Sequence, residues 1–184
     1  MTSPCPEADG SSPVQQTFQG PPPMCIDPTR RYGAEMVTAK GTLSIALDPI
    51  GAPKTVNNFV FLGRYHYFDG IVFHRVIPGF VLQGGDPTGT GTGGPGYRFD
   101  DELPKPGRYE LGSLAMANAG SNTNGSQFFV ISGPQGMQLP PKYSLFGKVV
   151  KGLDVVAAID AIGSPSGKPA EAVTITSVTI SESD

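Results

Sequence analysis

Residues 73–89 read FHRVIPGFVLQGGDPTG, and this stretch carries the strongest structural signal in the chain. The apolar runs on both sides of the Pro78-Gly79 pair predict two short strands joined by a turn. A single cation, Arg75, lies among these apolar residues. Taken alone, such an arginine is usually a surface residue with a solvated tip. Arg75, Phe80 and Gln83 converge, however, if the turn folds one strand end toward the next.

The composition predicts one loop-rich β domain. The 184 residues include 25 Gly and 19 Pro, and turn formers at this level between apolar runs are typical of short strands joined by loops. The net charge is −3 and no basic cluster exceeds Arg30-Arg31, which argues against nucleic acid as a partner. No apolar run approaches the roughly 18 residues of a membrane span, and the N-terminus lacks the pattern of a signal peptide.

Residues 1–33 are expected to form a Pro- and Ser-rich N-terminal arm or linker, followed by one domain over residues 34–184. The first 32 residues hold seven prolines and show little apolar periodicity. A segment of this composition buries too little apolar surface to form a packed element. We therefore expect the arm to lie outside the folded core.

Both cysteines, Cys5 and Cys25, lie in this arm. They are either two free thiols, as in a cytosolic protein, or a disulfide closing a loop of about 20 residues, which stabilises a protein by about 3 kcal/mol. We favour the disulfide, because an arm without a core gains most from such a link. A disulfide implies an oxidising compartment. The favoured location is therefore extracytoplasmic, or membrane-tethered through a missing N-terminal segment, with the cytoplasm as the alternative.

Periodicity and turn signals predict about eight strands and two helices. A hairpin is expected over residues 36–47, turning at Lys40-Gly41, and helices over residues 52–63 and 153–162. The other strands are expected at 71–76, 80–83, 113–117, 127–132, 144–150 and 173–180. In the last of these the apolar residues fall out of phase, which predicts a bulge near Thr176-Ser177. Because strands and helices do not alternate, the order favours an antiparallel barrel or sandwich capped by helices.

The sequence offers few residues suited to a metal site, a nucleotide site or covalent catalysis. The run GTGTGGPG at residues 89–96 matches the dinucleotide pattern GxGxxG, but its Pro95-Gly96 end disfavours the helix that such a site needs. A flexible loop beside a site is expected instead. Of the two histidines, His74 lies in an apolar strand pattern and is interpreted as a core or edge residue. A zinc site lacks ligands, since both cysteines lie in the arm, and neither a metal nor a cofactor is expected.

A second unusual segment, residues 116–129, reads MANAGSNTNGSQFF. Its small and amide residues predict a tight loop between strands, with amides available to hold backbone. Together with the stretch around Arg75, it closely resembles the cyclophilin family. The blocks FHRVIPGF, QGGDPTG, GTGGPG, MANAG, NTNGSQFF and LFGKV follow that family's order and spacing from about Glu35 to Ile180. The chain resembles a bacterial-like member that carries an N-terminal Pro-rich arm.

The resemblance implies a mainly β fold, namely a closed eight-stranded antiparallel β-barrel capped by two short α-helices, with a groove on its outer face. It also implies peptidyl-prolyl cis-trans isomerase activity, which assists protein folding without a cofactor. The partners would be X-Pro segments of unfolded or folded proteins. We expect a monomer.

By the same resemblance, Arg75 is the catalytic arginine. Arginine stays charged at working pH and donates from a rigid fork, which suits a donor aimed at a prolyl nitrogen. Phe80 and Phe129 match the floor of the family's proline pocket, and Leu139 matches its wall. The full set of substrate-binding positions is Phe80, Val81, Gln83, Gly91, Ala117, Asn118, Ala119, Gln127, Phe129, Gln138, Leu139 and Tyr143.

The chain departs from the family pattern at one wall of the groove. The segment over residues 133–141 is about one residue longer than in many relatives. Gln138 or Met137 stands where the best-known members carry tryptophan, and the chain has no Trp. Tyr143 stands where a histidine is frequent, and Val81 replaces a common methionine. These changes predict reduced affinity for cyclosporin more than reduced catalysis.

Two other function classes compete with catalysis. The same groove could hold Pro-containing peptides as a weakly active or inactive binding module, as aromatic grooves do elsewhere. A small-ligand barrel such as a lipocalin is disfavoured, because core side chains would fill the interior of a cyclophilin-like barrel. The presence of both Arg75 and the amide-rich loop favours the enzyme.

Overall fold

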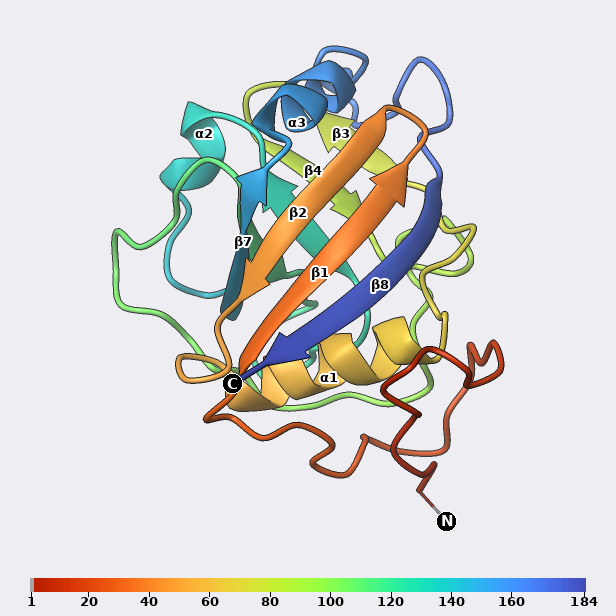
Figure 1. Ribbon diagram of the computed structural model, residues 1–184. Coiled ribbons are helices and arrows are strands. Elements are labelled where there is room, and N and C mark those ends of the chain that lie inside the picture. Colours follow the sequence, from red (N-terminus) through yellow and green to blue (C-terminus); the bar gives the residue numbers. More distant parts are fainter. Residues whose placement is uncertain (1) are drawn as a thin grey trace.

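One curled antiparallel sheet forms the centre of the computed structural model, which describes residues 2–184 (Figure 1). Its strands are β1 (Arg31–Thr38), β2 (Gly41–Leu47), β3 (Arg75–Ile77), β4 (Val81–Gly84), β5 (Ser113–Met116), β6 (Phe128–Ile131), β7 (Leu145–Lys151) and β8 (Ile175–Ser183). They are hydrogen-bonded in the order β3-β4-β6-β5-β7-β2-β1-β8. The expected mainly β fold with eight antiparallel strands is therefore confirmed.

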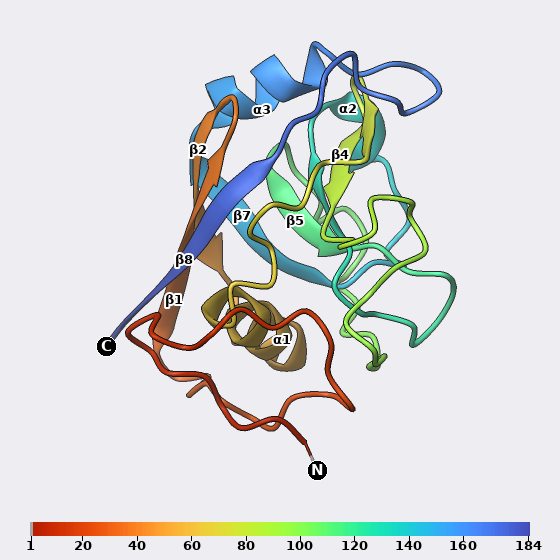
Figure 2. The same cartoon turned by 90° about the vertical axis from the view of Figure 1, so that its right-hand side faces the viewer.

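Among the described residues three helices accompany the sheet, α1 (Pro53–Arg64), α2 (Pro134–Met137) and α3 (Leu153–Asp160). In both views α1 lies near one end of the sheet and α3 near the other (Figures 1 and 2). Pro53 occupies the first turn of α1 as expected, where its missing N–H removes no helical bond. The prediction of two helices is wrong because of α2, whose four residues are too few to show a helical period.

The first two strands form the predicted hairpin. Thr38 pairs with Gly41 across the turn, and Thr38 Oγ1 donates a hydrogen bond to the Gly41 carbonyl at 2.7 Å. The first strand begins at Arg31, earlier than predicted, because β1 also pairs with β8 along its whole length. This second pairing joins the first and last strands of the sequence side by side in one sheet.

The predicted bulge in the last strand is confirmed. Val37 pairs with Ser177, whereas the residue after Val37 pairs with Ile175. Thr176 is therefore the extra residue, and one extra residue reverses the alternation of faces along a strand. As a result Ile175 and Val178 are both buried in the same core.

The strand predicted over residues 71–76 is shifted. Only Arg75–Ile77 pair with β4, as strand β3. Residues 70–73 instead form backbone hydrogen bonds of 2.8 to 3.0 Å with residues 173–175 at the start of β8. β3 and β8 are the two edge strands of the sheet. These hydrogen bonds therefore connect the segment before one edge strand with the start of the other.

Two apolar clusters lie on opposite faces of the sheet, since successive side chains of a strand point to opposite sides. On β6, Phe128 enters the main core and packs edge-on against Phe59 of α1. Its neighbour Phe129 points the other way. The cluster on that side, called the outer cluster below, consists of Val81, Tyr109, Ala115, Phe129 and Ile131. The outer face of the sheet is thus apolar enough to line a hydrophobic groove.

The expectation that the arm lies outside the core is wrong. Phe18 and Ile26 are only 3% and 6% exposed and belong to the main core cluster. The structure contains the Cys5–Cys25 disulfide, and both views show the arm running alongside α1 (Figures 1 and 2). The periodicity of apolar residues cannot reveal such packing. Phe18 and Ile26 are single buried residues outside any helix or strand, so they form no repeating pattern. The division of the chain after residue 33 stays a prediction.

Candidate active site

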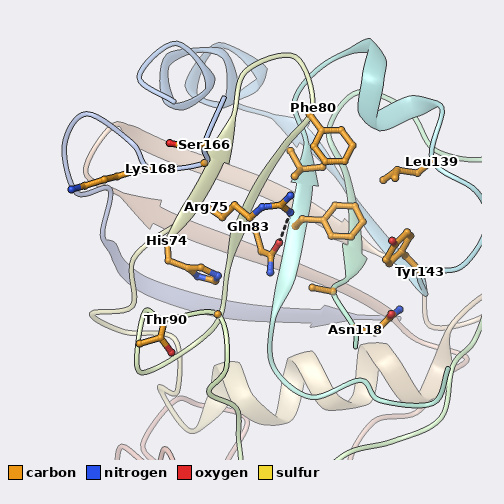
Figure 3. Close-up of a pocket in the computed structure, with 15 residues that line it drawn as sticks. His74, Arg75, Phe80, Gln83, Thr90, Asn118, Leu139, Tyr143, Ser166 and Lys168 are labelled. Carbon is orange, nitrogen blue, oxygen red and sulfur yellow. Dashed lines mark hydrogen bonds between the residues drawn. The ribbon is translucent and has the colours of Figure 1, made fainter. Parts of the chain in front are cut away.

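A cavity of about 520 Å³ opens against the outer cluster (Figure 3). It combines an apolar floor with one guanidinium group at its edge. Most of the predicted site residues line it, namely Arg75, Phe80, Val81, Gln83, Gly91, Ala117, Asn118, Phe129, Leu139 and Tyr143. The structure therefore gathers residues from three strands and four loops into one hollow.

A second cavity of about 820 Å³ adjoins the first. The two share Gln83, Gly91, Ala117 and Asn118, and the predicted residues Ala119 and Gln127 line only the second. Gln138 lines neither cavity; it is exposed directly after α2. Gln138 thus borders the site only through its chain neighbour Leu139, which lines the first cavity.

Register in the sheet places the key side chains in one row. Arg75 pairs with Gln83 across β3 and β4, and Gln83 pairs with Phe129 across β4 and β6. Residues directly opposite each other share a face of the sheet. Arg75, Gln83 and Phe129 therefore all face the outer side, as the turn at Pro78-Gly79 was expected to allow.

A chain of hydrogen bonds runs from Arg75 into the glycine-rich loop. Arg75 Nη1 donates to Gln83 Oε1 at 3.2 Å, and Gln83 Nε2 donates to Gln127 Oε1 at 3.1 Å. Gln127 Nε2 then donates to the carbonyls of Gly91 at 2.9 Å and Gly93 at 3.0 Å. Within residues 2–184 no other side chain bonds to the Arg75 guanidinium, so its remaining N–H donors are available to a substrate.

Buried Asp86 organises the glycine-rich loop. It is 1% exposed, and its carboxylate accepts backbone hydrogen bonds from Gly91 at 2.7 Å, Gly93 at 3.1 Å and Thr88 at 2.8 Å. Burial raises the pKa of Asp86, but hydrogen bonds from these residues outweigh burial, so its pKa lies below the ordinary value. The loop therefore wraps around an ionised carboxylate beside the cavity.

The apolar wall is held by a buried tyrosine. Phe129 and Tyr143 meet edge to face, with ring centroids 5.4 Å apart. Tyr109 Oη donates to the Tyr143 carbonyl at 2.7 Å and accepts from the Tyr143 N–H at 3.2 Å. Burial raises the pKa of Tyr109, which keeps its hydroxyl protonated as a donor. These two hydrogen bonds fix the backbone of Tyr143, so its ring stays packed against Phe129 at the edge of the cavity.

Asn118 uses its side chain inside the protein. Its Nδ2 donates to the Lys142 carbonyl at 2.9 Å, and its Oδ1 accepts from the Gly120 N–H at 3.1 Å. These bonds connect the amide-rich loop to the segment that carries Tyr143. The side chain of Asn118 therefore fixes the position of the loop that borders both cavities.

Comparisons with known proteins agree with this geometry. Residues 34–180 match the family model described as cyclophilin type peptidyl-prolyl cis-trans isomerase/CLD. The chain belongs to this family of isomerases. Peptidyl-prolyl cis-trans isomerase ppi1 of Schizosaccharomyces pombe is 47% identical over 146 residues, covering 77% of this chain and 94% of that one. Peptidyl-prolyl cis-trans isomerase B of Streptomyces anulatus is 46% identical over 167 residues, covering 80% and 95%.

Solved structures of cyclophilins superpose on the sheet. A crystal structure of a Cryptosporidium parvum cyclophilin type peptidyl-prolyl cis-trans isomerase has a TM-score of 0.76 and 35% identity, covering 84% of this chain and 99% of that one. A structure of the same protein in the presence of the dipeptide Ala-Pro has a TM-score of 0.75 and 37% identity, covering 83% and 99%. The chain is thus a cyclophilin-type peptidyl-prolyl cis-trans isomerase. It spans only 23% of a longer mouse relative, peptidylprolyl isomerase domain and WD repeat-containing protein 1, which is 45% identical over 149 residues.

Sequence reasoning missed one side of the cyclophilin cavity. The additional lining residues are His74, Thr90, Ser166, Gly167 and Lys168. In Figure 3, Ser166 and Lys168 lie on the opposite side of Arg75 from the apolar wall. The Gly167 carbonyl accepts from the Val76 N–H at 2.8 Å, which ties this loop to β3. Nothing in the local sequence signals that contact, because the two segments lie far apart along the chain.

His74 borders the cavity rather than lying wholly in the core. Burial lowers its pKa below the ordinary 6.5, the Asp86 carboxylate opposes this, and the Arg75 guanidinium adds to it. Its Nδ1 is buried with no hydrogen-bond partner among the described residues. Neutral His74 therefore lies next to Arg75 at neutral pH. Residues 2–184 contain no cluster of side chains suited to a metal ion and no helix long and apolar enough to cross a membrane.

Proposed function

We propose that this cyclophilin accelerates rotation about X-Pro bonds in protein substrates, and so assists folding, with Arg75 as the catalytic donor. One observation carries the proposal. The Arg75 guanidinium, which among residues 2–184 hydrogen-bonds only to Gln83, lies at the edge of a hollow floored by Phe129. A prolyl ring placed on that floor brings its nitrogen near the guanidinium.

The reaction suits a single fixed cation. Amide conjugation opposes rotation with a barrier of about 18–20 kcal/mol. In the twisted transition state the prolyl nitrogen becomes pyramidal and regains its lone pair. A guanidinium aimed at that nitrogen binds the twisted state better than the planar one, which lowers the barrier. No covalent bond breaks, so neither a nucleophile nor a metal ion is needed.

The remaining residues hold the substrate while one end turns. Phe80, Phe129 and Leu139 contact the ring, and an apolar setting favours the less polar twisted amide. Gln83 and the loop at Asn118 hold backbone on either side. A rate gain of about 10⁵ requires about 7 kcal/mol, a sum that these contributions can supply together.

The experiment that tests the proposal is cis/trans exchange of an Ala-Pro peptide measured by NMR. The wild type should broaden or exchange the two isomer signals, and a folded Arg75→Ala variant should lose most of that effect. Arg31→Ala, which removes an exposed arginine from β1, is the matched control and should exchange like the wild type. A wild type that binds the peptide without exchanging it would instead support the binding-module alternative.

Several finer expectations belong to the same proposal. We propose that the sheet acts as a closed barrel, supported by the bonds between residues 70–73 and 173–175. We also propose that the protein is a monomer and that it resembles bacterial members, and the similarity to the Streptomyces anulatus isomerase supports the second point. Cyclosporin should bind with reduced affinity, since Gln138 lies outside both cavities. Titration with cyclosporin and sedimentation of the protein test these two properties.

We further propose an extracytoplasmic location, with tethering through a missing segment as one form of it. The Cys5–Cys25 disulfide supports this location, because such bonds persist mainly in oxidising compartments. Thiol labelling of the protein recovered from its native cells is the test. Two reactive thiols in the native protein would favour the cytoplasm.

A further inference from the structure

The arm is a closed loop that is fastened to the domain at several points. The disulfide joins Cys5 to Cys25. Next to it, the Cys25 N–H donates to Asn57 Oδ1 of α1 at 2.7 Å. At the other end of α1, Tyr65 Oη donates to the Pro4 carbonyl at 2.9 Å, and Tyr65 accepts a backbone bond from Gln15 at 3.0 Å. We call residues 4–25 the strap.

The strap inserts one aromatic side chain into the protein. Phe18 is 3% exposed, and its ring lies 5.0 Å from that of Phe61 and 5.5 Å from that of Tyr65. Tyr67 and Tyr97 complete the surroundings, with centroids 6.4 and 6.3 Å away. Tyr97 also lines the second cavity. The buried ring of Phe18 therefore packs directly behind a residue of the groove.

The backbone of Phe18 contacts the same wall. Its N–H donates to the Pro95 carbonyl at 2.8 Å. Gly96 has φ +99°, and a Cβ added there would lie 2.4 Å from the Phe18 carbonyl oxygen. Only glycine permits both that conformation and that approach. Pro95, Gly96 and Tyr97 all line the second cavity, so Phe18 supports three consecutive wall residues.

The opposite end of this wall is held from inside the domain. Tyr97 Oη donates to Asn58 Oδ1 at 2.5 Å, and Asn58 Nδ2 donates to the Gly125 carbonyl at 2.9 Å. Gly125 also lines the second cavity. The wall is thus clamped between α1 and the strap, and Phe18 is the strap's only aromatic side chain.

We propose that the disulfide-closed strap sets the wall of the second cavity at Pro95–Tyr97, with Phe18 as a positioning residue for substrate segments outside the proline pocket. The inference rests on the proposed function, because it assumes that an extended peptide passes from the first cavity into the second. Phe18 touches no substrate. It acts through Pro95–Tyr97 on the binding of residues that flank the X-Pro unit.

Isomerisation of two substrates tests this role. One is a short Ala-Pro peptide that fills only the first cavity, and the other carries several residues on each side. Phe18→Ala should raise KM for the long peptide by roughly three- to tenfold, while kcat for it and kcat/KM for the short peptide change less than about twofold. Val14→Ala, an exposed apolar position of the same strap at 67% exposure, should leave both substrates unchanged.

Opening the disulfide provides an independent measurement. Mild reduction of the wild type, or Cys5→Ser with Cys25→Ser, should produce the same selective rise in KM. Amide hydrogen exchange at Phe99, whose N–H donates to the Asn124 carbonyl at 2.9 Å two residues after Tyr97, should become faster in parallel. These measurements keep the proposal testable if Phe18→Ala does not fold, with circular dichroism establishing that each variant is folded.

An unchanged KM for the long peptide after the strap is opened would overturn the proposal. An equal loss for both substrates would also overturn it, since that pattern indicates a general structural role. Failure of the proposed function looks different. In that case the wild type exchanges neither peptide, or Arg75→Ala exchanges both as fast as the wild type, whatever the state of the strap.

Discussion

Arg75 and Gln83 lie directly opposite each other in the β3–β4 ladder, and Arg75 Nη1 donates to Gln83 Oε1 at 3.2 Å. Because Gln83 is itself bonded to Gln127, the amide cannot rotate freely. The pair therefore orients an otherwise exposed guanidinium over the cavity. A neutral acceptor does so without competing strongly for the cation, which leaves the charge available to the substrate.

Gln83→Glu should reduce activity while preserving shape. A carboxylate opposite Arg75 forms a charge-assisted pair that holds the guanidinium away from the prolyl nitrogen, and it also loses the bond donated to Gln127. We expect kcat to fall by about tenfold or more, which corresponds to about 1.4 kcal/mol. The cis/trans exchange rate of an Ala-Pro peptide, followed by NMR, measures kcat. Gln135→Glu on the exposed face of α2 is the control. Unchanged kcat in a folded variant would show that Gln83 does not orient Arg75.

Tyr109→Phe should loosen the wall of the proline pocket. The variant removes the hydroxyl that bonds both the carbonyl and the N–H of Tyr143. Leaving such groups unsatisfied costs about 1–3 kcal/mol, so we expect a lower melting temperature and a KM several-fold higher for Pro peptides. Tyr32→Phe in β1, which loses one bond from the Asp27 N–H, should change stability without changing KM. Equal KM values for the two variants would contradict the prediction.

Activity should be nearly independent of pH between about 6 and 9. Burial holds the pKa of His74 below 6.5, hydrogen bonds hold the pKa of Asp86 below its ordinary value, and burial raises the pKa of Tyr109 above its ordinary value. Stability should behave differently. Below about pH 6.5 the unfolded chain binds a proton at His74 that the folded chain does not, so stability falls as pH decreases. Thermal unfolding at several pH values, with His74→Gln lacking this step, measures it. A steep loss of activity from pH 8 to 6 would exclude this account.

Substrates with an acidic residue beside the X-Pro unit should be favoured at low salt. The charged side chains lining the first cavity are Arg75 and Lys168, with no carboxylate among its lining residues. A solvent-exposed charge pair contributes up to about 1 kcal/mol and is screened by salt. Lys168→Glu should therefore lower kcat/KM for a Glu-containing peptide about three- to fivefold at low salt, and less at high salt. Lys105→Glu, at an exposed loop residue that lines neither cavity, is the control. If Lys168→Glu changes kcat/KM equally for acidic and neutral peptides, Lys168 does not recognise an acidic substrate residue.

Local patterns in the sequence predicted the parts of this fold that depend on neighbouring residues. The hairpin turn after Thr38, the helix starting at Pro53 and the bulge at Thr176 all follow from short-range alternation and turn chemistry. The meeting of Arg75 with Gln83 also followed, since a tight turn joins their strands. Each of these features is decided within a few residues of chain.

Contacts between distant segments could not be predicted in this way. Phe18 is one apolar residue in a polar, Pro-rich context, and its burial depends on aromatic rings distant in the chain, namely Phe61, Tyr65, Tyr67 and Tyr97. Lys168 lines the cavity because backbone hydrogen bonds hold its loop against Val76. The spacing of residues in the sequence does not predict a contact between segments this far apart. The role of Gln138 stays a prediction. The family motif implies a wall residue, whereas Gln138 directly follows α2, is exposed and lines neither cavity.

The strap also constrains the order of events when the chain is made. Residues 4–25 are synthesised before the rest of the domain, yet their partners include Asn57, Tyr65 and Tyr97. Cys5 and Cys25 can therefore be brought together in the native arrangement only after α1 and the glycine-rich loop have been synthesised. A nascent chain stopped before Tyr97 would therefore carry both thiols without the contacts that hold the strap on the domain, and their pairing at that stage would depend on loop closure alone.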